Sequence, residues 1–117
     1  MDEDWYGIRT VYEHVSRKQG QDRLYEERIV LIRAGSFEEA LAKAEAEANS
    51  YATEGVRFLN YSTAFRLFDP PTDGAEVFSL MRDSRRDPKR YIDTFIDTGR
   101  ERSHQQPTTP NQVPSIP

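Results

Sequence analysis

Cysteine is absent from this chain of 117 residues. Its absence excludes disulfide bonds and thiolate metal sites and suits a reducing compartment, so we expect a cytoplasmic protein. Long apolar runs are lacking as well, because no stretch approaches the roughly 20 residues that a membrane-spanning helix needs. The first residues, MDEDWYG, are acidic and carry neither the basic nor the apolar region of a signal peptide. We therefore predict no secretion and no membrane partner.

Histidine is nearly as scarce: His14 lies in an apolar stretch, and His104 lies near the C-terminus. A metal site would have to consist mostly of carboxylates, and no spacing of the acids suggests one. The motifs of serine hydrolases, dinucleotide-binding proteins and P-loop proteins are all missing. We therefore predict no catalytic residues, no metal and no cofactor, and these absences favour a protein that is not an enzyme.

An excess of positive charge is also lacking, since the net charge is −4, which argues against non-specific nucleic-acid binding. The basic residues gather in one segment, MRDSRRDPKR, where two aspartates interrupt them. The basic segment contains Arg82, Arg85, Arg86, Lys89 and Arg90. It could bind phosphate, nucleic acid or an acidic partner, or it is a solvated loop followed by a helix start.

Apolar residues are nearly missing from the last stretch, RERSHQQPTTPNQVPSIP, which holds four of the seven prolines. Such a composition cannot bury enough surface to offset the entropy lost on ordering. We therefore predict a disordered, Pro-rich tail over residues 100–117 and a single domain over residues 1–99.

The residues before the tail carry the periodic patterns of an α+β domain. WYGIRTVYEHV and LYEERIVLIRA are rich in β-branched and aromatic residues, and the short polar loop between them predicts an antiparallel hairpin. Ser36 followed by Glu39 forms a capping-box pattern, which predicts the start of a long amphipathic helix. Gly55 provides a natural end for this helix.

Two further strands and a short helix are predicted in the second half of the chain. VRFLNYSTAFRLFD predicts a third strand, and Ala75–Arg82 predicts a fourth strand that pairs with it as a hairpin. Asp87-Pro88 predicts the start of a short C-terminal helix, which runs to about Thr98. The predicted fold is a four-stranded, mainly antiparallel sheet in the order β-β-α-β-β-α, with one long helix on one face.

Both faces of the predicted sheet are apolar, and the run Ile29–Ile32 suggests a strand covered on both sides. One helix covers only one face. Because a large uncovered apolar face is rare on a soluble monomer, the second face needs a cover. The short C-terminal helix, a second copy of the chain or another protein would provide it, so we predict a homodimer or a protein partner.

The adjacent acids Glu26 and Glu27 leave opposite faces of their strand, so they cannot act as a catalytic pair with each other. Glu27 shares its face with Tyr25, which makes these two residues a candidate binding site with a nearby cation and aromatic ring. The candidate binding residues are Tyr25, Glu27, Arg9 and Trp5. A plainer interpretation is a polar strand end, with the acid paired to an arginine across the hairpin.

Four segments, taken in chain order, resemble the small bacterial domain-of-unknown-function family numbered 4288. They are WYGIR at Trp5–Arg9, YEERIVLIRA at Tyr25–Ala34, SFEEALAKAEAEA at Ser36–Ala48 and AEVFS at Ala75–Ser79. The resemblance implies a small bacterial α+β domain. It implies no catalytic or binding residues, and it does not extend to the basic segment or the tail.

Three classes of function stay open. The first is a non-enzymatic protein-interaction or accessory module, favoured by the two apolar faces and by the missing catalytic set. The second is a small-molecule-binding protein or small enzyme that uses Glu26 or Glu27 and an aromatic cleft. The third is weak nucleic-acid binding through the basic segment.

Overall fold

The computed structural model describes residues 3–15 and 20–99. The chain divides into two compact units, Met1–Leu80 and Met81–Pro117. The first unit holds a sheet and a helix, and the second holds a short helical segment. The predicted disordered tail, residues 100–117, lies outside the described residues, as does His104.

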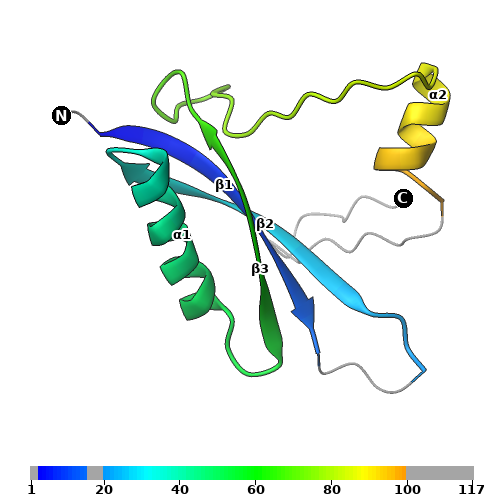
Figure 1. Ribbon diagram of the computed structural model, residues 1–117, viewed down its shortest axis with the longest axis horizontal. Helices are drawn as coiled ribbons and strands as arrows, with labels where there is room; N and C mark the ends of the chain where they lie inside the picture. Colours follow the sequence, from blue (N-terminus) through cyan, green and yellow to red (C-terminus); the bar gives the residue numbers. More distant parts are fainter. Residues whose placement is uncertain (1–2, 16–19, 100–117) are drawn as a thin grey trace. The chain divides into compact units, whose positions relative to one another are not determined.

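The sheet of the first unit has three antiparallel strands in the order β2-β1-β3 (Figure 1). The strands are β1 at Asp4–His14, β2 at Leu24–Ala34 and β3 at Val56–Arg66. β1 pairs with β2 along its whole length, which confirms the predicted hairpin. Because β1 is central, β2 and β3 are the two edges of the sheet in the part of the chain that the structure describes.

The helix α1, at Phe37–Tyr51, starts where the capping-box pattern predicts. The Ser36 hydroxyl accepts a hydrogen bond from the Glu39 amide at 3.1 Å, and the Glu39 carboxylate accepts one from the Gly35 amide at 2.8 Å. The first bond satisfies a main-chain donor that the helix start leaves free, and the second ties the Glu39 side chain to the residue before the cap.

The face of α1 that lies on the sheet is made of small side chains. Ala40, Ala44 and Ala48 are fully buried against β1 and its neighbours. They form two core clusters, one around Tyr6 and the other around Tyr12. Since alanine extends little beyond the main chain, α1 lies close to the sheet, and the aromatic rings of β1 fill the space beside it.

The helix is shorter than the sequence predicts, because it ends at Tyr51 and does not continue to Gly55. The Ala52 amide makes the last helical hydrogen bond, to the Ala48 carbonyl. The Thr53 amide then donates a hydrogen bond to the Tyr51 carbonyl at 2.8 Å. Gly55, with φ of 86°, lies in the turn that leads into β3 and does not cap the helix directly.

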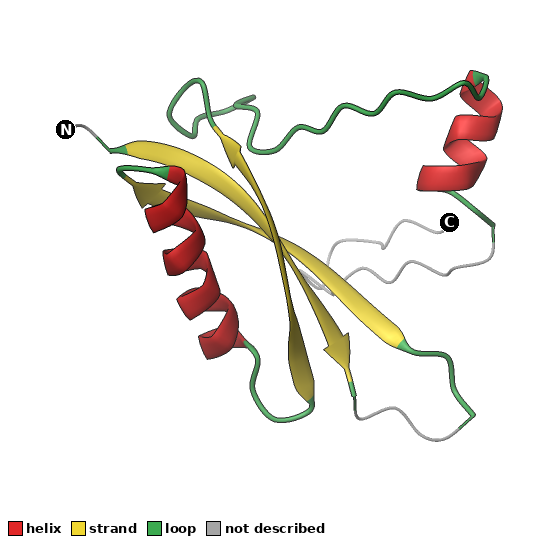
Figure 2. Ribbon diagram, viewed as in Figure 1, coloured by secondary structure: helices red, strands yellow, loops and turns green. Residues whose placement is uncertain are grey.

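The predicted fourth strand, Ala75–Arg82, is wrong, since this segment forms no strand and β3 pairs with β1 instead (Figure 2). We call the sheet face away from α1 the outer face. Val77 passes so close to this face that a side chain at Gly7 would overlap its carbonyl. Phe78 lies against Phe65, with ring centroids 6.3 Å apart. Val77 and Phe78 therefore cover part of the outer face, and their segment does not pair with an edge of the sheet.

The second unit contains a helical segment that begins at the predicted cap. α2 spans Pro88–Tyr91, and the Asp87 carboxylate accepts a hydrogen bond from the Arg90 amide at 2.9 Å. η1, a π-helical turn at Ile92–Ile96, follows directly, so the segment ends before the predicted Thr98. No residue of either element is buried. Among residues 3–15 and 20–99, no helix combines the length and the apolar character that a bilayer crossing requires.

Replacing Gly7 by alanine tests the close contact between the outer face and the Val77 main chain. We expect Gly7→Ala to lower the free energy of unfolding by about 1–3 kcal/mol, because the added methyl group displaces that carbonyl. Denaturant unfolding measures the change. Gly35→Ala is the matched control, since its methyl group would meet nothing closer than the Glu39 carboxylate at 3.5 Å. Equal stabilities for the two variants would contradict the contact.

Candidate functional site

The four candidate binding residues share the outer face, as the alternation of the two strands predicts. In the β1–β2 ladder, directly opposed residues carry their side chains on the same face. Arg9 is opposed to Ile29, and Glu27 is opposed to Val11. The outer-face candidates are Trp5, Arg9, Tyr25 and Glu27.

The structure brings only two of these residues together. An Arg9 guanidinium nitrogen lies 3.5 Å from a Glu27 carboxylate oxygen, with side chains 26% and 63% exposed. Trp5 and Tyr25 lie eight residues apart along the ladder, about 26 Å at the usual rise of a strand. Trp5 contacts Arg33 instead, whose guanidinium carbon is 5.7 Å from the ring centroid. The four residues therefore do not form one cleft, and the Arg9–Glu27 pair matches the plainer interpretation of a paired acid.

The part of the outer face that β2 contributes is open. Its apolar side chains Tyr25, Ile29 and Leu31 are 51%, 48% and 40% exposed, and we call these three residues the open patch. The residues that alternate with them along β2 are half-buried and lie on the face toward α1. The expectation that Ile29 and Leu31 are covered on both sides is therefore wrong. The segment around Val77 covers the outer face over β1 and β3 and leaves Ile29 and Leu31 exposed.

Two buried polar atoms on the outer face have no hydrogen-bond partner among the described residues. They are the Arg9 Nε and the Thr63 Oγ1, which belong to residues directly opposed across β1 and β3. The Phe78 ring lies beside Arg9, with its centroid 5.4 Å from the Arg9 guanidinium carbon. Buried polar groups are nearly always paired, so these two atoms are an exception among the described residues.

A second cluster, on the face that α1 covers, escaped the sequence interpretation. The Tyr51 hydroxyl lies 2.9 and 2.7 Å from the two Glu26 carboxylate oxygens, within hydrogen-bond distance of both. The His14 Nε2 lies 2.9 Å from one of these oxygens. The hydrogen bond from Tyr51 to Glu26, together with burial, raises the pKa of the Tyr51 phenol. The cluster joins the last turn of α1 to the first residues of β2.

Arg28 extends this cluster along β2. Its guanidinium donates two hydrogen bonds to the Glu47 carboxylate, at 3.0 and 3.2 Å, and one to the Tyr12 hydroxyl at 3.2 Å. It also lies over the Tyr51 ring, 3.6 Å from its centroid. The polar groups of the cluster are thus paired with one another, so the arrangement acts as a clamp between helix and sheet.

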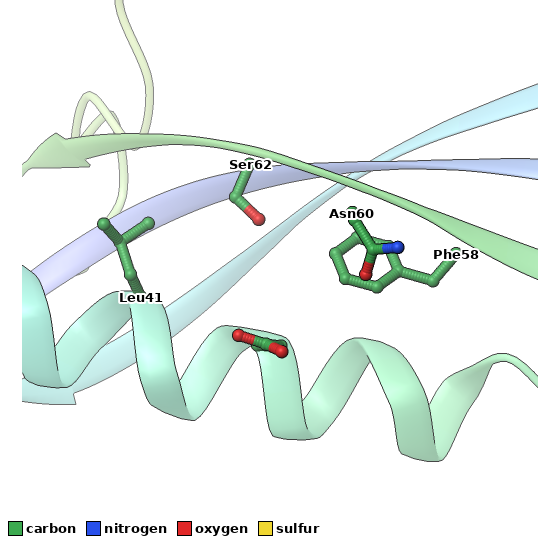
Figure 3. Close-up of a pocket in the computed structure, with 5 residues that line it drawn as sticks. Leu41, Phe58, Asn60 and Ser62 are labelled. Atoms are coloured by element: carbon green, nitrogen blue, oxygen red, sulfur yellow. The ribbon is translucent and has the colours of Figure 1, made fainter.

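A shallow cavity of about 300 Å³ lies between α1 and β3 (Figure 3). Its lining residues are Leu41, Glu45, Phe58, Asn60 and Ser62. Asn60 adopts a left-handed main chain with φ of 59°, at the place where the β1–β3 register shifts. Asparagine is uncommon within strands and tolerates this conformation, so Asn60 was a signal in the sequence of the irregular main chain beside this cavity. None of the predicted site residues lines it.

The basic segment makes its contacts within the second unit. The Arg82 guanidinium lies 4.3 Å from the Phe95 ring centroid and donates to the Tyr91 hydroxyl at 2.8 Å. Lys89 lies 2.8 Å from the Asp93 carboxylate, which raises the pKa of the lysine. The described residues contain no group of three or more His, Cys, Asp or Glu residues arranged to hold a metal ion.

Comparison with known proteins gives one match. The family model described as Domain of unknown function (DUF4288) matches residues 5–79, more than half of the chain. The matched region contains α1 and, apart from the first residue of β1, all three strands, and it confirms the resemblance drawn from the sequence. No curated protein and no solved structure matches the chain.

The Tyr51 clamp predicts a pH dependence of stability. The neutral phenol donates to Glu26, so the folded state holds its proton more tightly than the unfolded state. Its contribution is therefore complete below the ordinary tyrosine pKa of about 10 and is lost as the pH rises through the higher folded-state pKa. Tyr51→Phe should cost about 1–3 kcal/mol at pH 7 and should reduce the fall in stability above pH ~10. Denaturant unfolding between pH ~7 and ~11 measures both effects.

Tyr61→Phe is the control, because Tyr61 is exposed on β3. This variant should keep the stability and the pH dependence of the native chain. An unchanged fall in stability above pH ~10 in Tyr51→Phe would contradict the role of the clamp.

Proposed function

We propose that this chain, which belongs to the family described as Domain of unknown function (DUF4288), is a non-enzymatic protein-interaction module that binds a protein surface through the open patch. The observation that carries the proposal is the uneven cover of the outer face. The segment at Val77 and Phe78 lies over β1 and β3, whereas Ile29 and Leu31 on β2 stay exposed. The proposed setting is the bacterial cytoplasm, with a second copy or another protein as the partner.

The surroundings of the open patch support this proposal. Apolar residues on one strand form a row along the edge of the sheet, and charged residues, Glu27 and Arg33, stand between and beside them. Protein interfaces combine an apolar centre with a polar rim in this way. Exposed apolar residues that gather on one surface of a protein can mark an interaction site.

Site-specific photo-crosslinking in a bacterial host tests the proposal. A benzophenone side chain at position 29, Ile29→p-benzoylphenylalanine, should give a covalent adduct with a second protein chain on irradiation. The same group at position 38 should give none, because Glu38 is exposed on α1, far from the outer face. Adding Leu31→Asp to the position-29 variant should abolish its adduct. Equal adducts at both positions, or none at position 29, would count against the open patch as an interface.

One observation favours a second function, the binding of a small anion. The Arg9 Nε and the Thr63 Oγ1 are buried and unpaired among the described residues, they belong to residues directly opposed across β1 and β3, and the Phe78 ring lies beside Arg9. A carboxylate or phosphate oxygen would accept a hydrogen bond from both groups. The site would thus use one of the four candidate residues, Arg9, together with a hydroxyl on β3 that the sequence did not indicate.

Thr63→Val separates this function from a purely structural role. Removing an unpaired buried hydroxyl should raise the free energy of unfolding by about 1 kcal/mol in a buffer without small anions. Adding phosphate or acetate should then raise the melting temperature of the native chain and leave that of Thr63→Val unchanged. Thr10→Val is the control, because the Thr10 hydroxyl is buried but bonded to Tyr12, so its loss should destabilise the protein. Equal responses of native chain and Thr63→Val to both anions would rule out the anion site.

A further inference from the structure

We propose that a second copy of this chain pairs with β2 edge to edge, in antiparallel orientation about a two-fold axis at Val30, so that the open patches of the two copies meet side by side. This inference rests on the proposed function, since it takes the open patch as an interface and names its partner. The two sheets would join edge to edge, and the main chain of each β2 would supply hydrogen bonds to the other.

β2 has the properties of a strand that accepts another strand. It spans 11 residues, Leu24–Ala34, without proline, glycine or a bulge, and it lies at the end of the strand order. Within residues 3–15 and 20–99, no strand pairs with the edge of β2 that lies away from β1. A long, regular edge of this kind is a ready template for a further strand.

The opposite edge, β3, lacks this regularity. Its register with β1 shifts between Thr10 and Tyr12, where residues of β3 bulge out of the ladder. Asn60 lies in the bulge with φ of 59°. Bulges twist and interrupt an edge, and this is one way in which proteins prevent further pairing. The two edges thus differ, and β2 is the one suited to pairing.

The outer-face residues of β2 are complementary to themselves in one register. Antiparallel pairing centred on Val30 places Ile29 opposite Leu31 of the second copy. It also places Glu27 opposite Arg33 of the second copy, and the symmetry makes each pair occur twice. With the axis at Ile29, Glu27 would lie opposite Leu31 of the second copy. With the axis at Leu31, Ile29 would lie opposite Arg33 of the second copy. On the outer face, only the register centred on Val30 pairs apolar with apolar residues and acid with base.

Both charged residues are available for this pairing. The Glu27 side chain is 63% exposed, and its contact with Arg9 is long, at 3.5 Å. The Arg33 side chain is 61% exposed, and its guanidinium lies 3.8 Å from the nearest Glu3 carboxylate oxygen. Exposed pairs at such distances contribute little to stability, so each side chain can turn to a new partner at small cost.

A charge exchange tests the partner and the register together. Glu27→Arg and Arg33→Glu should each weaken the homodimer about tenfold, because each sets two like-charged pairs across the interface. An equimolar mixture of the two variants should dimerise as the native chain does, since every pair then joins opposite charges. Sedimentation equilibrium of the full chain over a concentration series measures the dissociation constants. Glu38→Arg, which makes the same charge change on exposed α1 surface, should leave them unchanged.

Disulfide trapping provides an independent measurement, because the chain has no cysteine of its own. Mixing Ile29→Cys with Leu31→Cys should give a mixed disulfide dimer under mild oxidation. Each variant alone should react far less, since residue 29 of one copy lies diagonally from residue 29 of the other. That diagonal separation is about 7–8 Å, beyond the usual Cα distance of a disulfide.

The outcomes separate this inference from the proposed function. A native chain that remains monomeric at all concentrations overturns the inference, and a position-29 adduct with a different protein would still support the proposed function. A dimer that neither variant weakens, or that the mixture does not restore, overturns the pairing through β2 centred on Val30. Circular dichroism of the variants confirms that each of them is folded.

Discussion

The close packing of α1 on the sheet is the constraint on which the rest of this structure depends. Three buried alanines bring the helix near the main chain of β1 and β2, and aromatic rings fill the space on either side. The last turn is then held by polar contacts, since Tyr51 reaches Glu26 and the Arg28 guanidinium lies on its ring. A single helix packed in this way covers only one face of the sheet. The segment at Val77 and Phe78 covers part of the outer face, and the residues of the open patch on β2 stay exposed.

Local signals predicted the parts of the fold that form locally. The hairpin of β1 and β2 followed from alternation and a short polar loop, and the start of α1 followed from Ser36 and Glu39. The prediction of a fourth strand was wrong because an extended segment that joins a sheet and one that lies across its face have the same pattern of apolar residues. β3 pairs with β1, and the local sequence pattern does not indicate which distant segment a strand pairs with.

The candidate site shows the same limit. Alternation correctly placed Tyr25 and Glu27 on one face, but it carries no information on distance, and the four candidates are spread along the ladder. The clamp around Glu26 was not predicted, because it depends on Tyr51, which lies 25 residues away in the chain. A tyrosine at the end of an alanine-rich helical stripe was the available signal. Its ring packs with the core, while its hydroxyl needs a polar partner.

The bulge at Asn60 has a consequence for the size of any assembly. A sheet with two regular edges can add copies at both sides, and such head-to-tail growth leads to open fibres. In this chain one edge is interrupted and the other is regular, so the proposed pairing through β2 would use the only regular edge that either copy offers among its described strands. In the proposed dimer, an irregularity of a few residues in β3 would thereby prevent the addition of further copies and would limit self-association to a closed pair.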